Sequence, residues 1–163
     1  MMQSELNTDL SQRVVDFAAD AVWHPSPQAG VTRRILDRQG AEVARATSVV
    51  RYAAGTHFPR HVHGGGEEIL VLDGVFSDEF GDYPAGTYLR NPPQTAHAPF
   101  SKLGCTIFVK LWQFQAGDQQ SVQFNATESS AWQPADGIWT GLAQCVGGFR
   151  PEIPASTLAN SPS

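Results

Sequence analysis

Two histidines separated by a single residue, His61 and His63, follow a run of β-forming character. In an extended chain, residues two apart project from the same face, so both imidazoles can bind one ion. Glu67 follows across three consecutive glycines, which allow a sharp turn back toward the imidazoles. His97 comes after the proline turn 91–93, which can start an antiparallel strand. Imidazoles and carboxylates bind divalent transition metals, so the pattern predicts a metal site on two antiparallel strands.

Nearby residues offer alternatives to this ligand set. Glu68 also follows the glycines, but on an extended chain it points to the face opposite Glu67, which favours Glu67 as the ligand. His57 lies four residues before His61, and we interpret it as an exposed histidine. A His-Val-His sequence by itself is more often solvated or hydrogen-bonded than metal-binding, so the prediction depends on the whole pattern.

The elements expected to position these residues are short strands. Runs rich in β-branched and aromatic residues alternate with turns, and the 15 glycines and 11 prolines fit such a pattern. This spacing is typical of an all-β sandwich or barrel. The predicted strands are Val31–Asp37, Val43–Tyr52, Glu68–Asp73, Val75–Phe80, Thr87–Arg90 and Cys105–Gln115.

A short N-terminal helix is predicted before the strands. Apolar residues recur at helical spacing over Leu6–Val22, and Thr8 or Asp9 can cap the start of this helix. The segment 24–27 contains two prolines and ends the helix, because proline disfavours helical geometry in the residue before it.

Composition limits the classes of function. A chain of 163 residues suits one domain, and its formal net charge of −5 gives no broad positive field, so no direct nucleic-acid partner is expected. Neither a signal peptide nor a run of the ~18 apolar residues that a membrane span needs is present, so we expect a cytoplasmic protein without a membrane partner. Cys105 and Cys145 are far apart and are interpreted as reduced thiols.

The fixed residues around the candidate ligands form two frames with regular spacing. These are Gly55, His61, His63, Glu67 and Gly74 in the first, and Gly86, Pro92, Gln94 and His97 in the second. The frames resemble the paired motifs of the cupin superfamily, the first at every fixed position. The second departs at Gln94, where the family usually has glycine, and at Ser101, where it often has asparagine. The resemblance implies an RmlC-like jelly-roll β-barrel.

The sequence around the two frames is similar to the cupin domain of ChrR-type anti-sigma factors. The similarity covers roughly Trp23–Phe114. In that family a separate N-terminal zinc-binding domain contacts the sigma factor. The first fifty residues here contain no cysteine and only one histidine, His24, so a direct anti-sigma role is not expected. The resemblance implies zinc binding by three histidines and a glutamate, which correspond to His61, His63, His97 and Glu67.

Three functions are compatible with such a site. The first is a ChrR-like protein that binds or senses a small molecule in the barrel, or responds to an oxidant through a residue such as Cys105. The second, by similarity to single-domain cupins, is a non-heme iron dioxygenase that cleaves a small diketone or hydroxyketone, with Glu79, Tyr88 and Arg60 as acid–base candidates. The third is a structural metal in an interaction module. The ligand set suits Zn, Fe, Mn or Ni.

We expect three segments along the chain. Residues 1–30 pack on the barrel, residues 31–150 form it, and residues 151–163 are a flexible tail. From Cys105 onward, apolar residues occupy both faces of the predicted strand, so both faces should be covered. A homodimer would cover the outer face, and the N-terminal segment or the tail is the alternative.

Overall fold

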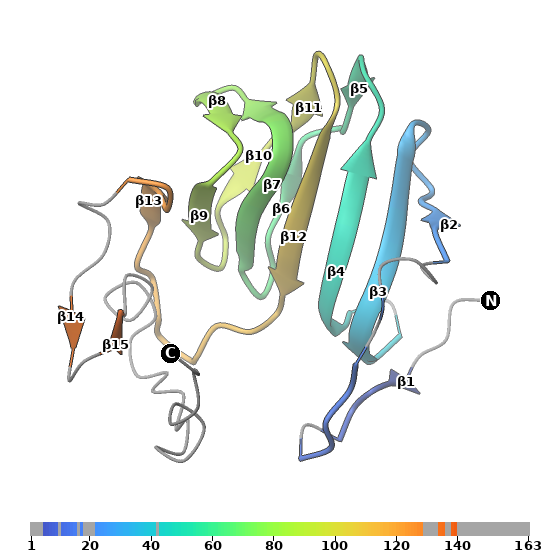
Figure 1. Cartoon of the computed structure of the whole chain (residues 1–163), viewed down its shortest axis with the longest axis vertical. Coiled ribbons are helices and arrows are strands. Elements are labelled where there is room, and N and C mark those ends of the chain that lie inside the picture. The colour runs from blue at the N-terminus through green and yellow to red at the C-terminus, as the bar shows by residue number, and fades with distance from the viewer. Residues whose placement is uncertain are drawn as a thin grey trace, which may run out of the picture.

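The computed structural model describes residues 5–9, 11–15, 17, 22–41, 43–128, 134–135 and 138–139. Every helix or strand assigned in these ranges is a β-strand, and the paired strands are antiparallel (Figure 1). This arrangement confirms the predicted all-β class. None of the described residues belongs to a helix that could cross a membrane.

The framework of the molecule is a curved sheet. In it β3 (Val31–Gln39), β4 (Arg45–Tyr52), β12 (Cys105–Leu111) and β7 (Glu67–Asp78) lie side by side (Figure 1). Strand β12 pairs along its whole length with β4 on one side and with β7 on the other. The sheet therefore joins parts of the chain that are far apart in sequence.

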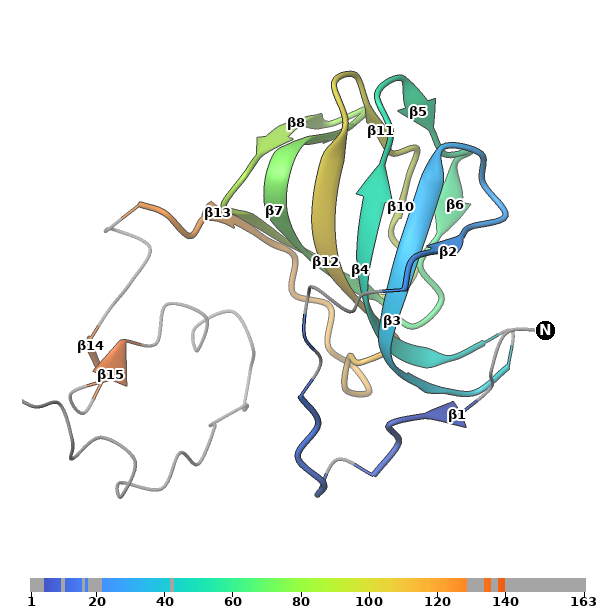
Figure 2. The same ribbon diagram turned by 45° about the vertical axis from the view of Figure 1, so that its right-hand side comes forward.

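Shorter strands complete the fold. Strands β6 and β10 form a separate two-stranded sheet that lies behind the large sheet in both ribbon views (Figures 1 and 2), and β9 and β13 extend the large sheet beyond β7. The shorter strands are β1 (Glu5–Leu6), β2 (His24–Pro25), β5 (Thr56–His57), β6 (His61–Val62), β8 (Gly81–Pro84), β9 (Thr87–Asn91), β10 (Ala96–His97), β11 (Phe100–Ser101), β13 (Val122–Asn125), β14 (Pro134–Ala135) and β15 (Ile138–Trp139).

The hydrophobic core follows from the alternation of side chains along the long strands. In β12, Ile107 and Val109 are buried, whereas their neighbours Thr106, Phe108 and Lys110 are only half-buried. Ile69 and Val71 of β7 and the ring of Phe76 join them in one cluster. Removal of this apolar surface from water stabilises the fold and fixes the register of the strands.

The predicted helix over Leu6–Val22 is wrong for the described residues of that range, none of which is helical. Leu6 lies in β1 and pairs with Arg38 of β3. The Asp9 carboxylate accepts hydrogen bonds from the backbone N–H and the hydroxyl of Ser11, which closes a local turn. Helical spacing of apolar residues is a weak preference, and pairing with β3 and this turn satisfy the backbone instead.

The two strands predicted on either side of Gly74 form one continuous strand, β7. Gly74 has a left-handed φ of 72°, and a Cβ atom here would lie 2.2 Å from the carbonyl oxygen of Gly104. Glycine therefore lets the strand bend closely against its neighbour without ending it. The register with β12 shifts beside this bend, so that Leu72 has no opposite residue on β12.

The described part of the N-terminal segment contacts the large sheet. The Asn7 amide donates a hydrogen bond of 2.7 Å to the carbonyl of Leu36, and the Arg34 guanidinium donates one of 3.0 Å to the carbonyl of Phe17. A cavity of about 400 Å³ at this contact is bordered by Phe108 of β12. The segment thus lies near the face of β12 that carries Phe108.

Three expectations concern parts of the chain that the structure does not describe. Strands β14 and β15 pair with each other, but most of residues 129–150, predicted to complete the barrel, lie outside the described ranges. The predicted tail 151–163 and Cys145 lie outside them as well.

Candidate metal centre

The four predicted ligands come together between β6, β10 and the start of β7. His61 lies directly opposite His97 in the pair formed by β6 and β10, and these strands are antiparallel, as predicted. His63 follows β6, and Glu67 is the first residue of β7, so a third strand contributes where only two had been expected. One potential ligand atom from each of the four residues lies within 4.8 Å of the other three. The cluster could hold one metal ion.

The turn that precedes β10 fixes the position of His63. The His63 backbone N–H donates to the Thr95 carbonyl at 2.9 Å, and the His63 carbonyl accepts from the Gln94 N–H at 2.8 Å. Gln94 has a left-handed φ of 72°, which accounts for the glycine usual at this position of the motif. Ser101, the second departure from the motif, is fully buried and donates a hydrogen bond of 2.6 Å to the Val75 carbonyl. Both departures therefore preserve the local structure.

His61 and His97 are each oriented by an acceptor beside Nδ1. The His61 Nδ1 lies 3.0 Å from the Pro59 carbonyl oxygen, and the His97 Nδ1 lies 3.1 Å from Asp78 Oδ2. Burial raises the pKa of Asp78, but hydrogen bonds from His97 and its other neighbours outweigh burial and hold that pKa below its ordinary value. Neither acceptor carries a proton, so both Nδ1 atoms donate, and each ring in its neutral form keeps its lone pair on Nε2.

The ring of His63 is also held with its proton on Nδ1, in this case by a hydroxyl group. Its Nδ1 lies 3.0 Å from Thr95 Oγ1, and the Thr95 hydroxyl donates its own proton to the Pro92 carbonyl at 2.7 Å. The hydroxyl must therefore accept from the imidazole, which places the ring proton on Nδ1 and the lone pair on Nε2. Hydrogen bonds of this kind are typical of histidines that bind metals through the opposite nitrogen.

Two of the atoms that face one another in the cluster lack hydrogen-bond partners. Glu67 Oε2 lies 3.3 Å from the Nε2 of His63 and 3.4 Å from the Nε2 of His97. Both Glu67 Oε2 and His63 Nε2 are buried without a hydrogen bond. Because buried polar atoms are nearly always paired in proteins, converging lone pairs of this kind fit a bound cation.

Burial and neighbouring charges compete in the cluster. Burial raises the pKa of Glu67, but contact with His97 and the charges of the imidazoles hold it below its usual value. Burial lowers the pKa of His63. Burial also opposes protonation of His97, but its contacts with Asp78 and Glu67 raise its pKa to about 9. A proton on His97 can thus offset the buried negative charge when no metal does so.

Asp78 is a residue of the site that the sequence patterns did not predict. Besides contacting His97, its carboxylate accepts a hydrogen bond of 2.9 Å from the Tyr83 hydroxyl and two from the backbone of the following turn. Side chains alternate between the two faces of a strand, and positions 67 and 78 differ by an odd number of residues. Strict alternation would therefore place Asp78 on the face opposite Glu67. The extra residue at Leu72 reverses the alternation and turns Asp78 inward.

The three catalytic candidates Glu79, Tyr88 and Arg60 lie outside the four-residue cluster. Glu79 accepts a hydrogen bond of 2.7 Å from the Ala98 N–H, which lowers the pKa of its carboxyl, and lies 3.9 Å from Arg60 Nε. The Tyr88 hydroxyl donates to Glu68 at 2.7 Å. These contacts are of the kind that stabilise a fold, and they do not direct the three side chains to the metal ligands.

Two other residues considered from the sequence are also separate from the cluster. The His57 ring stacks on Phe100 with centroids 5.4 Å apart. Cys105 is buried, and burial raises the pKa of its thiol. Because the thiolate is the reactive form of cysteine, this environment does not favour the predicted oxidant response at Cys105.

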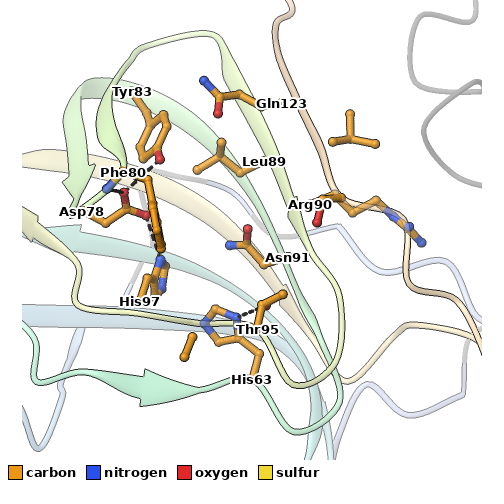
Figure 3. Close-up of a pocket in the computed structure, with 13 residues that line it drawn as sticks. His63, Asp78, Phe80, Tyr83, Leu89, Arg90, Asn91, Thr95, His97 and Gln123 are labelled. Carbon is orange, nitrogen blue, oxygen red and sulfur yellow. Dashed lines mark hydrogen bonds and ion pairs between the residues drawn. The ribbon is translucent and has the colours of Figure 1, made fainter.

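A pocket of about 560 Å³ opens beside the cluster, and His63 and His97 form part of its wall (Figure 3). Arg90 borders the pocket too, but its guanidinium points away from the other side chains and binds Asp118 at 2.5 Å. The rest of the wall combines apolar and polar side chains. These are Asp78, Phe80, Tyr83, Leu89, Asn91, Thr95, Ala96, Ser121, Val122 and Gln123.

Known structures share this fold. An RmlC-like cupin from Shewanella frigidimarina matches with 14% identity and a TM-score of 0.53, over 67% of this chain and 93% of that one. A putative acetylacetone dioxygenase from Methylibium petroleiphilum matches with 16% identity and a TM-score of 0.55, over 80% of this chain and 98% of that one. At these identities the similarity concerns the fold alone, and it confirms the predicted RmlC-like cupin architecture.

The sequence itself points to a narrower group. A chain in the crystal structure of Rhodobacter sphaeroides SigE in complex with the anti-sigma ChrR is 28% identical, with a TM-score of 0.49; the match covers 58% of this chain. This protein spans 51% of the length of that chain. No curated protein sequence matches. A family model described as the ChrR cupin-like domain matches residues 11–115, most of the described sequence, and the chain therefore belongs to this family.

Proposed function

We propose that this protein binds one divalent transition-metal ion through His61, His63, Glu67 and His97 and uses it to bind a small molecule in the adjacent pocket. In this role it is a ChrR-like cupin that binds or senses that molecule. One observation carries the proposal. The Nε2 of His63 and the Oε2 of Glu67 are buried, lie 3.3 Å apart and have no hydrogen-bond partner.

The donor set and its surroundings fit a metal such as zinc, iron, manganese or nickel. When bound, the metal supplies a Lewis acid with a coordination position for a ligand atom. Asp78, Thr95 and the Pro59 carbonyl hold the three imidazoles with their Nε2 atoms free, so metal binding needs little rearrangement. The charges of Glu67 and Asp78 balance the two positive charges of the ion.

The pocket wall favours an uncharged ligand. Among the described side chains that line it, Arg90 is the one permanent cation, and it is bound to Asp118. The amides of Asn91 and Gln123 can form hydrogen bonds with neutral oxygen or nitrogen atoms of the ligand. Apolar wall residues such as Phe80 can contact its hydrocarbon part.

A second candidate function is an iron-dependent dioxygenase acting on a small diketone or hydroxyketone. The observation that favours it is the direct contact between the pocket of about 560 Å³ and two of the four ligands, which gives an organic substrate access to the metal. The same contact weakens the third hypothesis, a structural metal in an interaction module, because a closed site needs no such access.

We also propose that the protein is a homodimer. Several apolar side chains of the N-terminal segment, such as Val14 and Phe17, are more than half exposed in the single chain, and a second subunit would cover them. Light scattering after size-exclusion chromatography should give twice the chain mass of 17.6 kDa. A mass of one chain at micromolar concentration would contradict the dimer.

Elemental analysis of protein purified without added metal tests the central proposal. We expect about one metal ion per chain and loss of the metal in His61→Ala. His57→Ala is the matched control, because this histidine stacks on Phe100 outside the cluster and its removal should leave the metal in place. Iron would favour the dioxygenase and lead to oxygen-consumption assays with diketones. Zinc would favour binding or sensing, and absence of metal that cannot be restored by added ions would contradict the proposal.

A further inference from the structure

The loop that joins His63 to Glu67 packs directly on two aromatic rings from a distant part of the chain. Residues 64–66 of this loop are all glycine. A Cβ atom on the first or second glycine would lie 2.9 Å or 2.1 Å from the Trp112 indole, and one on the third would lie 2.3 Å from the Phe114 ring. Side-chain carbons do not approach so closely, so the rings touch the loop with no room for a methyl group.

Trp112 adopts a backbone conformation that brings its indole over the loop. Its φ is 59°, in the left-handed region that bulky residues rarely occupy. Its N–H donates a hydrogen bond of 3.2 Å to the carbonyl of Gly66. The side chain is 44% exposed, so insertion into the core does not account for this conformation. Contact with the glycine loop does, and uncommon backbone conformations tend to persist where the surroundings enforce them.

Phe114 also contacts a buried ionic network. The guanidinium carbon of Arg90 lies 4.1 Å from the centroid of the Phe114 ring. Arg90 is itself buried, and it pairs with Asp118 at 2.5 Å and lies 3.6 Å from Glu68, the residue after Glu67. The ring thus contacts both this buried cation and the glycine loop, and these contacts limit its movement.

We propose that Trp112 and Phe114 act as an aromatic clamp that sets the positions of His63 and Glu67 and so determines how tightly the protein holds its metal. The inference rests on the proposed metal binding. Neither ring is a ligand, and both are positioning residues. Two of the four ligands are joined by only three glycines, the most flexible of residues, so without an external support their separation would vary. A support that fixes ligand positions in advance strengthens binding.

A double-mutant cycle on Gly65 and Trp112, with Co²⁺ as the probe ion, tests the clamp. The φ of Gly65 is not left-handed, so Gly65→Ala changes the space under the indole without straining the backbone. We expect it to weaken Co²⁺ binding by about 10-fold or more, as loss of an outer contact to a metal ligand does. In the Trp112→Ala background the same change should alter the Kd by no more than about 2-fold, because the indole that the added methyl group would displace is absent, and this non-additivity is the mark of a direct contact.

Two further measurements separate positioning from general damage to the fold. The visible absorption spectrum of bound Co²⁺ depends on ligand geometry, and we expect it to change in Gly65→Ala. Far-UV circular dichroism of the metal-free variants should stay as in the wild type. Trp23→Ala is the matched control, because this indole stacks with Arg51 at 3.9 Å and does not touch the glycine loop, so Co²⁺ affinity should be retained.

The outcomes distinguish the clamp from the proposed function. Unchanged Co²⁺ affinity in Gly65→Ala, or an equal loss with and without the indole, would overturn the clamp alone. Absence of Co²⁺ binding by the wild type would overturn the proposed metal binding and the clamp with it. If Gly65→Ala does not fold, Phe114→Leu replaces it. Weaker Co²⁺ binding by this variant with unchanged circular dichroism would support the clamp, and unchanged affinity would overturn it.

Discussion

Two adjacent glutamates at the start of β7, Glu67 and Glu68, are both buried, yet their surroundings differ. Adjacent residues of a strand point to opposite faces. Glu68 accepts a hydrogen bond of 2.7 Å from the Tyr88 hydroxyl and lies 3.6 Å from Arg90 Nε. Glu67 Oε2 faces the imidazoles and has no hydrogen-bond partner. Burial alone therefore does not distinguish a binding site from a structural ion pair.

The chemical character of the neighbouring groups makes the distinction. The groups around Glu68 are donors. The atoms nearest Glu67 are the Nε2 atoms of His63 and His97, and with the ring protons held on Nδ1 these are acceptors. Acceptors that face one another repel unless a cation lies between them. A proton on His97 or a metal ion meets this need, and the three imidazoles and one carboxylate favour the metal.

The largest loss of metal affinity should come from Glu67→Gln, which is compared with the same exchange of carboxylate for amide at Glu68. Glu67→Gln removes a proposed metal ligand, so we expect metal affinity to fall by more than about 100-fold. That factor is the upper end of the range for loss of a group that only hydrogen-bonds to a ligand. Glu68→Gln leaves Arg90 paired with Asp118, so it should keep the affinity and lower the thermal stability. Titration calorimetry with Zn²⁺ measures the first effect. Retention of wild-type affinity by Glu67→Gln would remove the contrast between the two glutamates.

A smaller loss of affinity is expected for Asp78→Asn. The carboxylate lies 3.1 Å from His97 Nδ1, and an amide can turn its NH₂ group toward that nitrogen and favour the wrong tautomer. Metal affinity should fall about 10- to 100-fold, the range found for such outer partners. Asp73→Asn, at an exposed position of the same strand, is the matched control. Equal Zn²⁺ affinities of the two variants would show that Asp78 does not orient the ligand.

Asp78 also shows what sequence patterns can and cannot predict about the site. The grouping of the four candidate ligands could be predicted, because side-chain alternation and the glycine turn act over a few residues and a proline turn can start the antiparallel strand of His97. Asp78 could not, because the alternation between Glu67 and Asp78 is interrupted by the extra residue at Leu72. A glycine within a strand often marks such a bulge, and Gly74 was the available signal.

The fold also contains elements that could be predicted from the sequence and elements that could not. Strands such as β12 were predictable, since they are rich in β-branched and aromatic residues, although β12 ends at Leu111 and not at Gln115 as predicted. The helix predicted over Leu6–Val22 is absent from the described residues of that range, since pairing with β3 offers Leu6 backbone hydrogen bonds that local spacing does not reveal. The aromatic clamp was also out of reach, because the contact between Trp112 and the glycines depends on a left-handed φ that tryptophan rarely adopts.

Tyr88→Phe examines the network of Glu68 without removing a charge. The substitution deletes one hydrogen bond of 2.7 Å to a buried carboxylate that still has Arg90 beside it. We expect the free energy of unfolding to fall by about 1–2 kcal/mol, with Zn²⁺ affinity unchanged. Urea denaturation of the metal-free protein measures the loss. A clear loss of Zn²⁺ affinity instead would place Tyr88 in the metal site and not in the structural network.

The smallest effect should be a pH dependence from Asp118. A hydrogen bond from Arg90 lowers the pKa of Asp118 from 3.8 to about 2 in the folded protein. A carboxyl whose pKa is lower in the folded state adds stability above its unfolded pKa, and this contribution is lost as the pH falls through the folded value. The wild type should therefore lose this contribution to stability between about pH 4 and pH 2. Asp118→Asn does not have the contribution at any pH.

Calorimetric unfolding of the metal-free proteins between pH 5 and pH 2 measures this difference. Glu67 and Asp78 also have lowered pKa values and destabilise the protein in acid in the same direction, but they are present in both the wild type and the variant. The gap between the two unfolding temperatures thus reports Asp118 alone, and it should narrow as the pH falls. A constant difference between the two unfolding temperatures would mean that the ion pair of Asp118 and Arg90 adds no stability. Glu68 would then be the residue that holds Arg90 against Phe114.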